Sequence, residues 1–409
     1  MTTLPDTTAI RRLPTVEFVG LLAMLFAMTA FSIDAMLPAM PEIASELTPD
    51  APNRAQLIIT SFVLGMGIGT FVTGPLSDTF GRRAVILGGA VLYSIGAVLA
   101  WAAPTLELVL AARLLQGLGV AGPRIAGVAL IRDLYAGRDM ARLVSFVMMV
   151  FTLVPAVAPL FGAFIIAGFG WRGIFVAFVL FAAMSITWFM LRQAETLPVS
   201  NRRPFSSFAL IEAAREVLTH RLVMSVTLVQ TLAFASLFTT LSSTQQVFDQ
   251  SFGRAEGFPK WFAVIAIIAG TASLLNARLV PHLGMRLMVK ATFAAQVANS
   301  TVILAIFIFG LVPDYMNFWL YLYWTITVFF MTGLTIGNLN ALALEPMGHI
   351  AGMASSIVAA LATVLSVLVA VPIGLAFNGT PVPLMAGVLG CSLMALLLMR
   401  LVPRADVIG

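Results

Sequence analysis

The decapeptide GPLSDTFGRR, residues 74–83, is a polar, turn-forming segment between two long apolar runs of the chain. Its glycines, Gly74 and Gly81, permit close helix approach and a tight turn, because glycine has no Cβ and adopts positive φ readily. Asp78 can accept hydrogen bonds from backbone amides at the start of a neighbouring helix. The two arginines that end the segment suit a polar interface. The segment therefore predicts a short polar connection between two apolar helices.

The composition places those helices in a membrane. Of 409 residues, 60% are hydrophobic and only 10% are charged, and the mean hydropathy is +1.00. These values exclude a water-soluble globular protein. A helix needs about 20 apolar residues to cross the hydrocarbon core, and unpaired backbone groups are costly there. We predict an all-α membrane protein with twelve transmembrane helices, near residues 16–40, 55–76, 84–103, 106–131, 141–168, 172–191, 221–247, 259–280, 287–311, 316–343, 350–377 and 380–402.

The basic residues predict the orientation of these helices. Sixteen Lys and Arg residues fall in loops on one side, and four fall on the other, namely Arg54, Arg172, Arg254 and Lys260. By the positive-inside rule, both termini are expected in the cytoplasm. Three further arginines, Arg113, Arg124 and Arg278, lie within predicted spans.

The longest interruption of the hydrophobic pattern, residues 192–220, divides the spans six and six. We predict an N-terminal half (1–191), a cytoplasmic linker (192–220) and a C-terminal half (221–409). Within the linker, residues 204–218 have the pattern of a short amphipathic helix that begins after a proline and a serine.

Several absences from the sequence exclude other classes of function. The single cysteine, Cys391, excludes an internal disulfide, and no Cys/His cluster predicts a metal site. The formal charge of +5 is spread over short loops, which does not indicate nucleic-acid binding. No nucleotide-binding loop and no nucleophile–base set is present. We therefore expect no enzymatic activity, no cofactor, no metal and no nucleic-acid partner.

One acid and one arginine lie deep in the predicted spans at a similar depth. Arg113 begins the stretch RLLQGLG in the fourth span, where an arginine needs a partner or water. At 1.5 Å per residue, Arg113 lies about 10 Å and Asp34 about 9 Å inside the outer ends of their spans. We predict that Asp34 couples protons, with Arg113 as its charge partner and Gln116 as a polar neighbour. The alternative is that the pair only joins helices 1 and 4.

The fifth span contains VPAVAPLFGA, residues 154–163. Pro155 and Pro159 are expected to kink the helix, and Gly162 permits close packing. A kink with a purely structural role remains the alternative.

These motifs together resemble the major facilitator superfamily, and within it the Bcr/CflA group of bacterial drug/proton antiporters. The resemblance covers nearly the whole chain and is more specific in the first half. It departs in the fifth span, where Ala158-Pro159-x-x-Gly162-Ala163 replaces a Gly-Pro-x-x-Gly-Gly core. The positions that match the family's signature loop are Gly74, Leu76, Asp78, Gly81, Arg82 and Arg83.

The resemblance implies a fold of two six-helix halves with the substrate site at the midplane between them. It also implies that the signature loop is a latch that closes the cytoplasmic side. The matching partners would be Asp133, at the end of the fourth span, and the amides near Gly352. A multi-pass monomer in the bacterial inner membrane is expected.

The substrate is less sharply indicated than the fold. Flexible Met and aromatic side chains bind varied apolar molecules, and a few amides orient them. Clustered Arg or Lys for sugar phosphates or dicarboxylates is missing, so neutral or weakly cationic lipophiles fit better. The candidate cavity residues are Ala30, Gln116, Met149, Gln230, Phe234, Phe238 and Phe262.

We therefore expect a proton-coupled secondary transporter that exports small lipophilic compounds or drugs by antiport. Its partners would be the small-molecule substrate, protons and the lipid bilayer. A dedicated metabolite transporter is an alternative, because a fold does not determine the cargo. A more remote alternative is a non-transporting membrane receptor.

Overall fold

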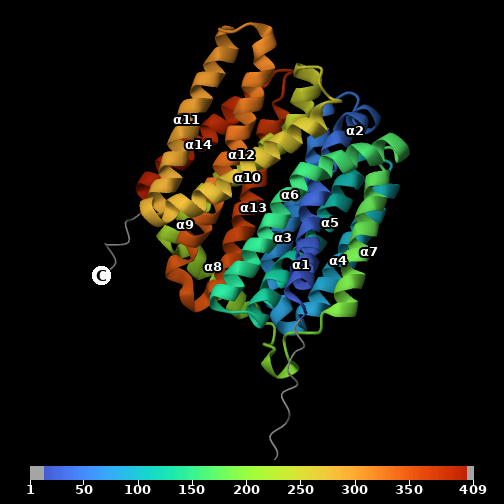
Figure 1. Cartoon of the computed structure of the whole chain (residues 1–409), viewed down its shortest axis with the longest axis vertical. Coiled ribbons are helices and arrows are strands. Elements are labelled where there is room, and N and C mark those ends of the chain that lie inside the picture. Colours follow the sequence, from blue (N-terminus) through green and yellow to red (C-terminus); the bar gives the residue numbers. More distant parts are fainter. Residues whose placement is uncertain (1–12, 403–409) are drawn as a thin grey trace, which may run out of the picture.

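The computed structural model describes residues 13–402, without the side chains of residues 138, 141–142, 145 and 148–152. Within this range the chain is nearly all helix and contains no strand (Figure 1). This confirms the predicted all-α class.

The described residues form twelve long helices. Ten stretches are long and apolar enough to cross a membrane. One of these, Asp314–Leu375, contains two of the twelve helices. The remaining helix, α6, has a shorter apolar segment, Leu153–Phe169. The predicted count is thereby confirmed. The helices are α1 (Thr15–Asp34), α3 (Leu57–Phe80), α4 (Arg82–Ala102), α5 (Leu106–Leu134), α6 (Gly137–Phe169), α7 (Gly173–Arg192), α9 (Arg221–Gln246), α10 (Phe258–Leu283), α11 (Met285–Phe309), α12 (Asp314–Leu344), α13 (Ala351–Leu375) and α14 (Val382–Leu401).

Short helices occupy the connections. The segment η1 (Leu37–Ala39), α2 (Met40–Leu47) and η2 (Pro52–Gln56) leads from α1 to α3, and η4 (Val247–Ser251) follows α9. Between α7 and α9 lie η3 (Val199–Asn201) and α8 (Ser207–Thr219), and η5 (Glu345–Ile350) precedes α13. The amide of Ala209 donates to the Ser206 hydroxyl, which caps α8.

The regular α-helix of the first span ends before the predicted span does, although the apolar helical stretch as a whole runs from Thr15 to Leu47. The regular helix α1 ends at Asp34, whereas the apolar run continues to residue 40. Pro38 lies in that continuation, and Pro41 directly follows it. Because proline has no amide hydrogen and disfavours helix in the residue before it, the chain turns through η1. Asp34 is consequently the last residue of a helix rather than a mid-helix residue.

The long helices lie roughly side by side, with the first six (blue to green) next to the last six (yellow to red) (Figure 1). We call the end of the bundle at which α3 ends the linker end, and the end at which α3 begins the far end. The two sets of six meet mainly where α3 packs against α13 and α6 packs against α10.

Glycines set the closest packing inside the first set. A Cβ built on Gly117 of α5 would overlap the backbone carbonyl of Phe62, and one on Gly65 of α3 would overlap that of Leu114. The backbones of α3 and α5 are therefore in direct contact, as small residues permit in membrane helices. This contact holds α5 and its arginines in a fixed position against α3.

We predict that Gly117→Ala lowers the free energy of unfolding by about 1–3 kcal/mol, the usual cost of overpacking. Gly88→Ala is the matched control, because a Cβ there has no atom within 4 Å. The control should be neutral or slightly stabilising, since alanine favours helix. Thermal unfolding of both variants in nanodiscs measures the difference. Equal stability of the two variants would contradict the packing described.

Candidate functional site

Arg82 joins three helices at the linker end. Its side chain is only 8% exposed, with Nη1 donating to Asp78 Oδ1 at 2.6 Å and Nε donating to Asp133 Oδ2 at 2.8 Å. Nη1 also donates to Ser77 Oγ at 3.0 Å. Asp78 lies on α3, Arg82 on α4 and Asp133 near the end of α5. Charge-assisted hydrogen bonds of this kind are stronger than neutral ones, so the network ties α3, α4 and α5 together.

Gly81 forms the turn between α3 and α4. Its φ is +96°, a conformation that L side chains rarely adopt. A Cβ at this position would also lie 2.5 Å from Glu195 Oε2 and 2.8 Å from Arg202 Nη2. Both the backbone conformation and the space around it therefore require glycine.

Glu195, which sequence reasoning missed, caps the start of α4. Its two carboxylate oxygens accept hydrogen bonds from the amides of Arg82 at 3.0 Å and Arg83 at 3.1 Å. A carboxylate is favourable at a helix N-terminus because it pairs with free amides and with the helix dipole. The adjacent Thr196 donates to Asp133 Oδ2 at 2.8 Å. The only sequence signal was an acid three residues after α7.

Arg83 has different partners from Arg82. Its Nη2 donates to the backbone oxygen of Met190 on α7 at 2.8 Å. The two neighbouring arginines therefore attach α4 to different helices.

The linker end also brings α3 close to α13. A Cβ built on Gly74 would lie 3.1 Å from Ser356 Oγ. Gly352 lies near Arg132, with 3.8 Å between its built Cβ and Arg132 Nη1. Asp78 was expected to meet the amides near Gly352, but within the described part of the chain its carboxylate accepts hydrogen bonds only from Arg82. That expectation is corrected, because the Asp78 carboxylate is paired with Arg82, one helical turn away.

A second polar contact joins the two sets of helices at the far end. Gln56 Nε2 donates to Gln246 Oε1 at 2.6 Å, and Gln246 Nε2 donates to Asn53 Oδ1 at 2.7 Å. Ser243 Oγ donates to Gln56 Oε1 at 2.9 Å. We call these four residues, Asn53, Gln56, Ser243 and Gln246, the far-end clamp. It connects η2, in the first set, to α9, in the second.

Backbone atoms of the second set extend the far-end clamp. Asn53 Nδ2 donates to the carbonyl oxygens of Leu375 at 3.1 Å and Phe377 at 2.7 Å, at and just past the end of α13. Gln56 Nε2 also reaches the oxygen of Gly374 at 3.3 Å. Sequence reasoning missed this site, although the polar run TTLSSTQQ, residues 239–246, within an apolar span was a signal.

Arg113 is fully buried and bonded to neutral groups. Nη1 donates to Gln116 Oε1 at 2.6 Å, Nη2 to the backbone oxygen of Ser32 at 2.9 Å and Nε to that of Ile58 at 3.3 Å. The guanidinium lies 4.4 Å from the centre of the Phe62 ring, a distance suited to a cation–π interaction. The structure therefore places Gln116 beside Arg113, as expected.

Asp34 is not the partner of Arg113 in this conformation. Its side chain is buried, and it has no hydrogen bond or ion pair with any residue that the structure describes. The predicted ion pair between Asp34 and Arg113 is therefore absent. Arg113 instead donates its hydrogen bonds to two backbone carbonyl oxygens and to the side-chain oxygen of Gln116. Asp34 is left as a buried acid at the end of α1.

The predicted kink residues lie in α6, which runs through Pro155 and Pro159 as one helix. A Cβ built on Gly162 would overlap the backbone oxygen of Ala35. Gly162 therefore brings α6 against the residue that follows Asp34.

The predicted cavity residues are scattered over buried surfaces. Phe234 and Phe238 stack with ring centres 5.7 Å apart, and Phe262 meets Phe329 at 5.8 Å. Ala30 and Gln230 are buried, and Gln230 Oε1 has no hydrogen-bond partner among the described groups. The side chain of Met149 lies outside the described residues.

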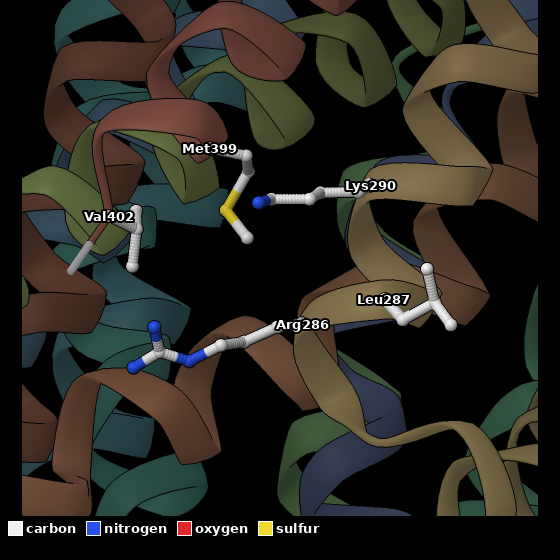
Figure 2. Close-up of a pocket in the computed structure, with 5 residues that line it drawn as sticks. All are labelled: Arg286, Leu287, Lys290, Met399 and Val402. Carbon is white, nitrogen blue, oxygen red and sulfur yellow. The ribbon is translucent and has the colours of Figure 1, made fainter. Parts of the chain in front are cut away.

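A cavity of about 200 Å³ lies elsewhere, at the linker end between α11 and α14. Figure 2 shows Lys290 extending from α11 toward Met399 of α14, and Arg286 extending from the same helix toward the side of Val402. The predicted cavity residues whose side chains are described do not line it.

A bundle of two six-helix sets that meet at both ends is the architecture of a secondary transporter. The chain belongs to the Major Facilitator Superfamily, whose family model matches residues 21–371. It is therefore a multi-pass membrane protein of a transporter family rather than of an enzyme family.

Three known proteins illustrate the relationship. The chain is 28% identical to the "Uncharacterized MFS-type transporter YdgK" of Bacillus subtilis, over 87% of this chain and 88% of the relative. It is 29% identical to a "Bicyclomycin resistance protein homolog" of Haemophilus influenzae, over 83% and 84%. Its fold resembles the crystal structure of a D-xylose-proton symporter, with a TM-score of 0.73, 16% identity and coverage of 94% and 98%.

We predict that Glu195→Ala destabilises the linker end by about 1 kcal/mol, the usual cost of removing a helix N-cap. The two amides at the start of α4 lose their acceptor, and the linker loses its attachment there. Limited trypsin digestion after Arg202 should therefore be faster, whereas the bond after Arg203 precedes Pro204 and resists trypsin. Glu212→Ala, an exposed acid of α8, is the control. Unchanged cleavage in the Glu195 variant would contradict the capping role.

Proposed function

We propose that this protein is a proton-coupled antiporter that exports small lipophilic compounds by alternating access. The observation that carries the proposal is the pair of contacts between the two helix sets at opposite ends of the bundle. The name of the bicyclomycin resistance relative supports a drug-like cargo. We place the protein as a monomer in the bacterial inner membrane, with the linker end and both termini in the cytoplasm.

The two contacts would open in turn. Neutral hydrogen bonds contribute only about 0.5–1.5 kcal/mol each to stability, so the far-end clamp can separate at a cost of a few kcal/mol. At the linker end, α3 meets α13 through small residues, Gly74 and Ser356. The Arg82 network lies within the first set, so it would keep α3 and α5 together while α13 moves away.

Proton coupling is assigned to Asp34, with Arg113 and Gln116 of α5 as its charged and polar counterparts; Arg113 donates to the backbone oxygen of Ser32, two residues before Asp34. A change in the charge of a buried carboxyl has large effects in a low-dielectric interior. Loading or releasing a proton there would therefore shift the populations of the two states. In the other state, Arg113 could exchange its carbonyl partners for the Asp34 carboxylate.

We predict that Asp34→Asn abolishes accumulation of cargo driven by a pH gradient, because residue 34 can no longer gain or lose a charge. Binding of neutral cargo should change by less than about threefold. The control is Asp50→Asn, an exposed acid at the far end. Proteoliposomes given an imposed pH step provide the measurement, with cargo chosen from a drug-susceptibility panel in an efflux-deficient host. Gradient-driven accumulation by the Asp34→Asn variant would overturn the assignment.

The proposed opening of the linker end can be tested by a disulfide. The built Cβ of Gly74 lies 3.9 Å from Ser356 Cβ, close to the mean separation of about 3.8 Å in disulfides. In a Cys391→Ala background, oxidation of Gly74→Cys with Ser356→Cys should stop transport, and a reductant should restore it. Each single cysteine is a control. Full transport by the cross-linked protein would show that this end does not open.

A further inference from the structure

A second arginine lies deep in α5 and has only a weak partner among the residues that the structure describes. Arg124 Nη1 contacts Met66 Sδ at 3.3 Å, and no carboxylate of the described residues lies within 4.0 Å of its guanidinium. A thioether is a poor acceptor. Ten residues, or about 15 Å at 1.5 Å per residue, separate Arg124 from the end of α5. A charge at such a depth is costly and is typical of a functional site.

Arg124 lies at the level where the two helix sets meet. It follows Arg113 by eleven residues, close to three helical turns, so both project from one face of α5. Its contact, Met66, precedes Gly67, whose built Cβ would lie 2.9 Å from Val364 Cγ2 of α13. The guanidinium therefore lies at the level where α3 of the first set packs on α13 of the second.

A hydroxyl group without a partner lies at a similar depth on α1. A Cβ built on Gly127 of α5 would lie 2.7 Å from Phe26 Cε1, so these positions are level. Because α1 and α5 run in opposite directions, Thr29, three residues after Phe26, lies within about one helical turn of the level of Arg124, three residues before Gly127. Thr29 is buried, and its Oγ1 has no hydrogen-bond partner among the described groups. Buried polar groups are usually paired, so this hydroxyl is available to a ligand.

The charges of the interior favour an anion. With Asp34 ionised, Asp34, Arg113 and Arg124 carry one negative and two positive charges. Among the described residues, Arg113 has three strong acceptors and Arg124 has none. We propose that Arg124 binds an oxyanion group, a carboxylate or sulfonate, of a lipophilic cargo, with Thr29 as a second donor. The role of this site in transport rests on the proposed export function. It widens the expected cargo from neutral and weakly cationic lipophiles to amphiphilic anions.

This role differs from a structural role in its effect on stability. An arginine that held the fold together would destabilise the protein when replaced. An uncompensated charge in the interior is itself unfavourable, so Arg124→Gln should keep or raise the midpoint of thermal unfolding while it weakens anion binding.

The experiment compares two fluorescent lipophiles of similar shape. The anionic probe is 1-anilinonaphthalene-8-sulfonate and the neutral probe is N-phenyl-1-naphthylamine. Binding to the full chain in nanodiscs is measured with empty nanodiscs subtracted. Arg124→Gln should weaken binding of the sulfonate at least tenfold and that of the neutral probe less than twofold. Arg124→Lys should retain part of the sulfonate affinity, and Arg278→Gln, an exposed arginine of α10, should change neither.

Each result separates this inference from the export proposal, because binding is measured without transport. Equal sulfonate affinity of the parental protein and the Arg124→Gln variant would overturn the inference, as would equal loss for both probes or no sulfonate binding by the parental protein. A fall in the unfolding midpoint together with loss of both probes would assign Arg124 a structural role instead. Neutral cargo would still be exported if only the Arg124 inference failed.

Discussion

The buried guanidinium of Arg82 is the interaction on which the linker end depends. It pairs with carboxylates on α3 and α5 while its own amide is bound by Glu195. Three helices and the linker are thus joined by charge-assisted bonds, which are the strong ones in proteins. The contacts between the two helix sets contain no such bond among the interactions described above. They consist of small residues at one end and neutral amides at the other.

This difference in strength suits a protein that changes shape between two rigid parts. Strong bonds within the first set keep its helices together, and weak bonds between the sets allow either end to open at a modest cost in free energy. The deep charges add a second constraint. Among the residues that the structure describes, Asp34 has no ion pair and Arg124 contacts only the thioether of Met66. A proton and a cargo are therefore suited to change the charge balance.

The sequence predicted features that depend on single residues or local patterns. Twelve helices follow from hydropathy, and the meeting of Arg82 with Asp133 followed from a family motif. The partners in the far-end clamp could not be predicted in this way. Asn53 and Gln246 are 193 residues apart, and the polar run that contains Gln246 does not indicate which residues it contacts. The partners of Arg113 were also mistaken, because depth alone cannot tell a carboxylate from a backbone oxygen at the same level. Glu195 escaped notice because a capping acid in a linker looks like any solvated charge.

The most direct test of alternating access is the distance between spin labels at both ends of the same protein. One pair would be placed at Phe80 and Gly348 at the linker end, and another at Asp50 and Asn378 at the far end; the native residues at these positions are exposed. Pulsed electron–electron double resonance on the protein in nanodiscs would measure both distances as the pH and the cargo concentration are varied. The account predicts that one distance lengthens as the other shortens. Distances that never change, or that lengthen together, would contradict it.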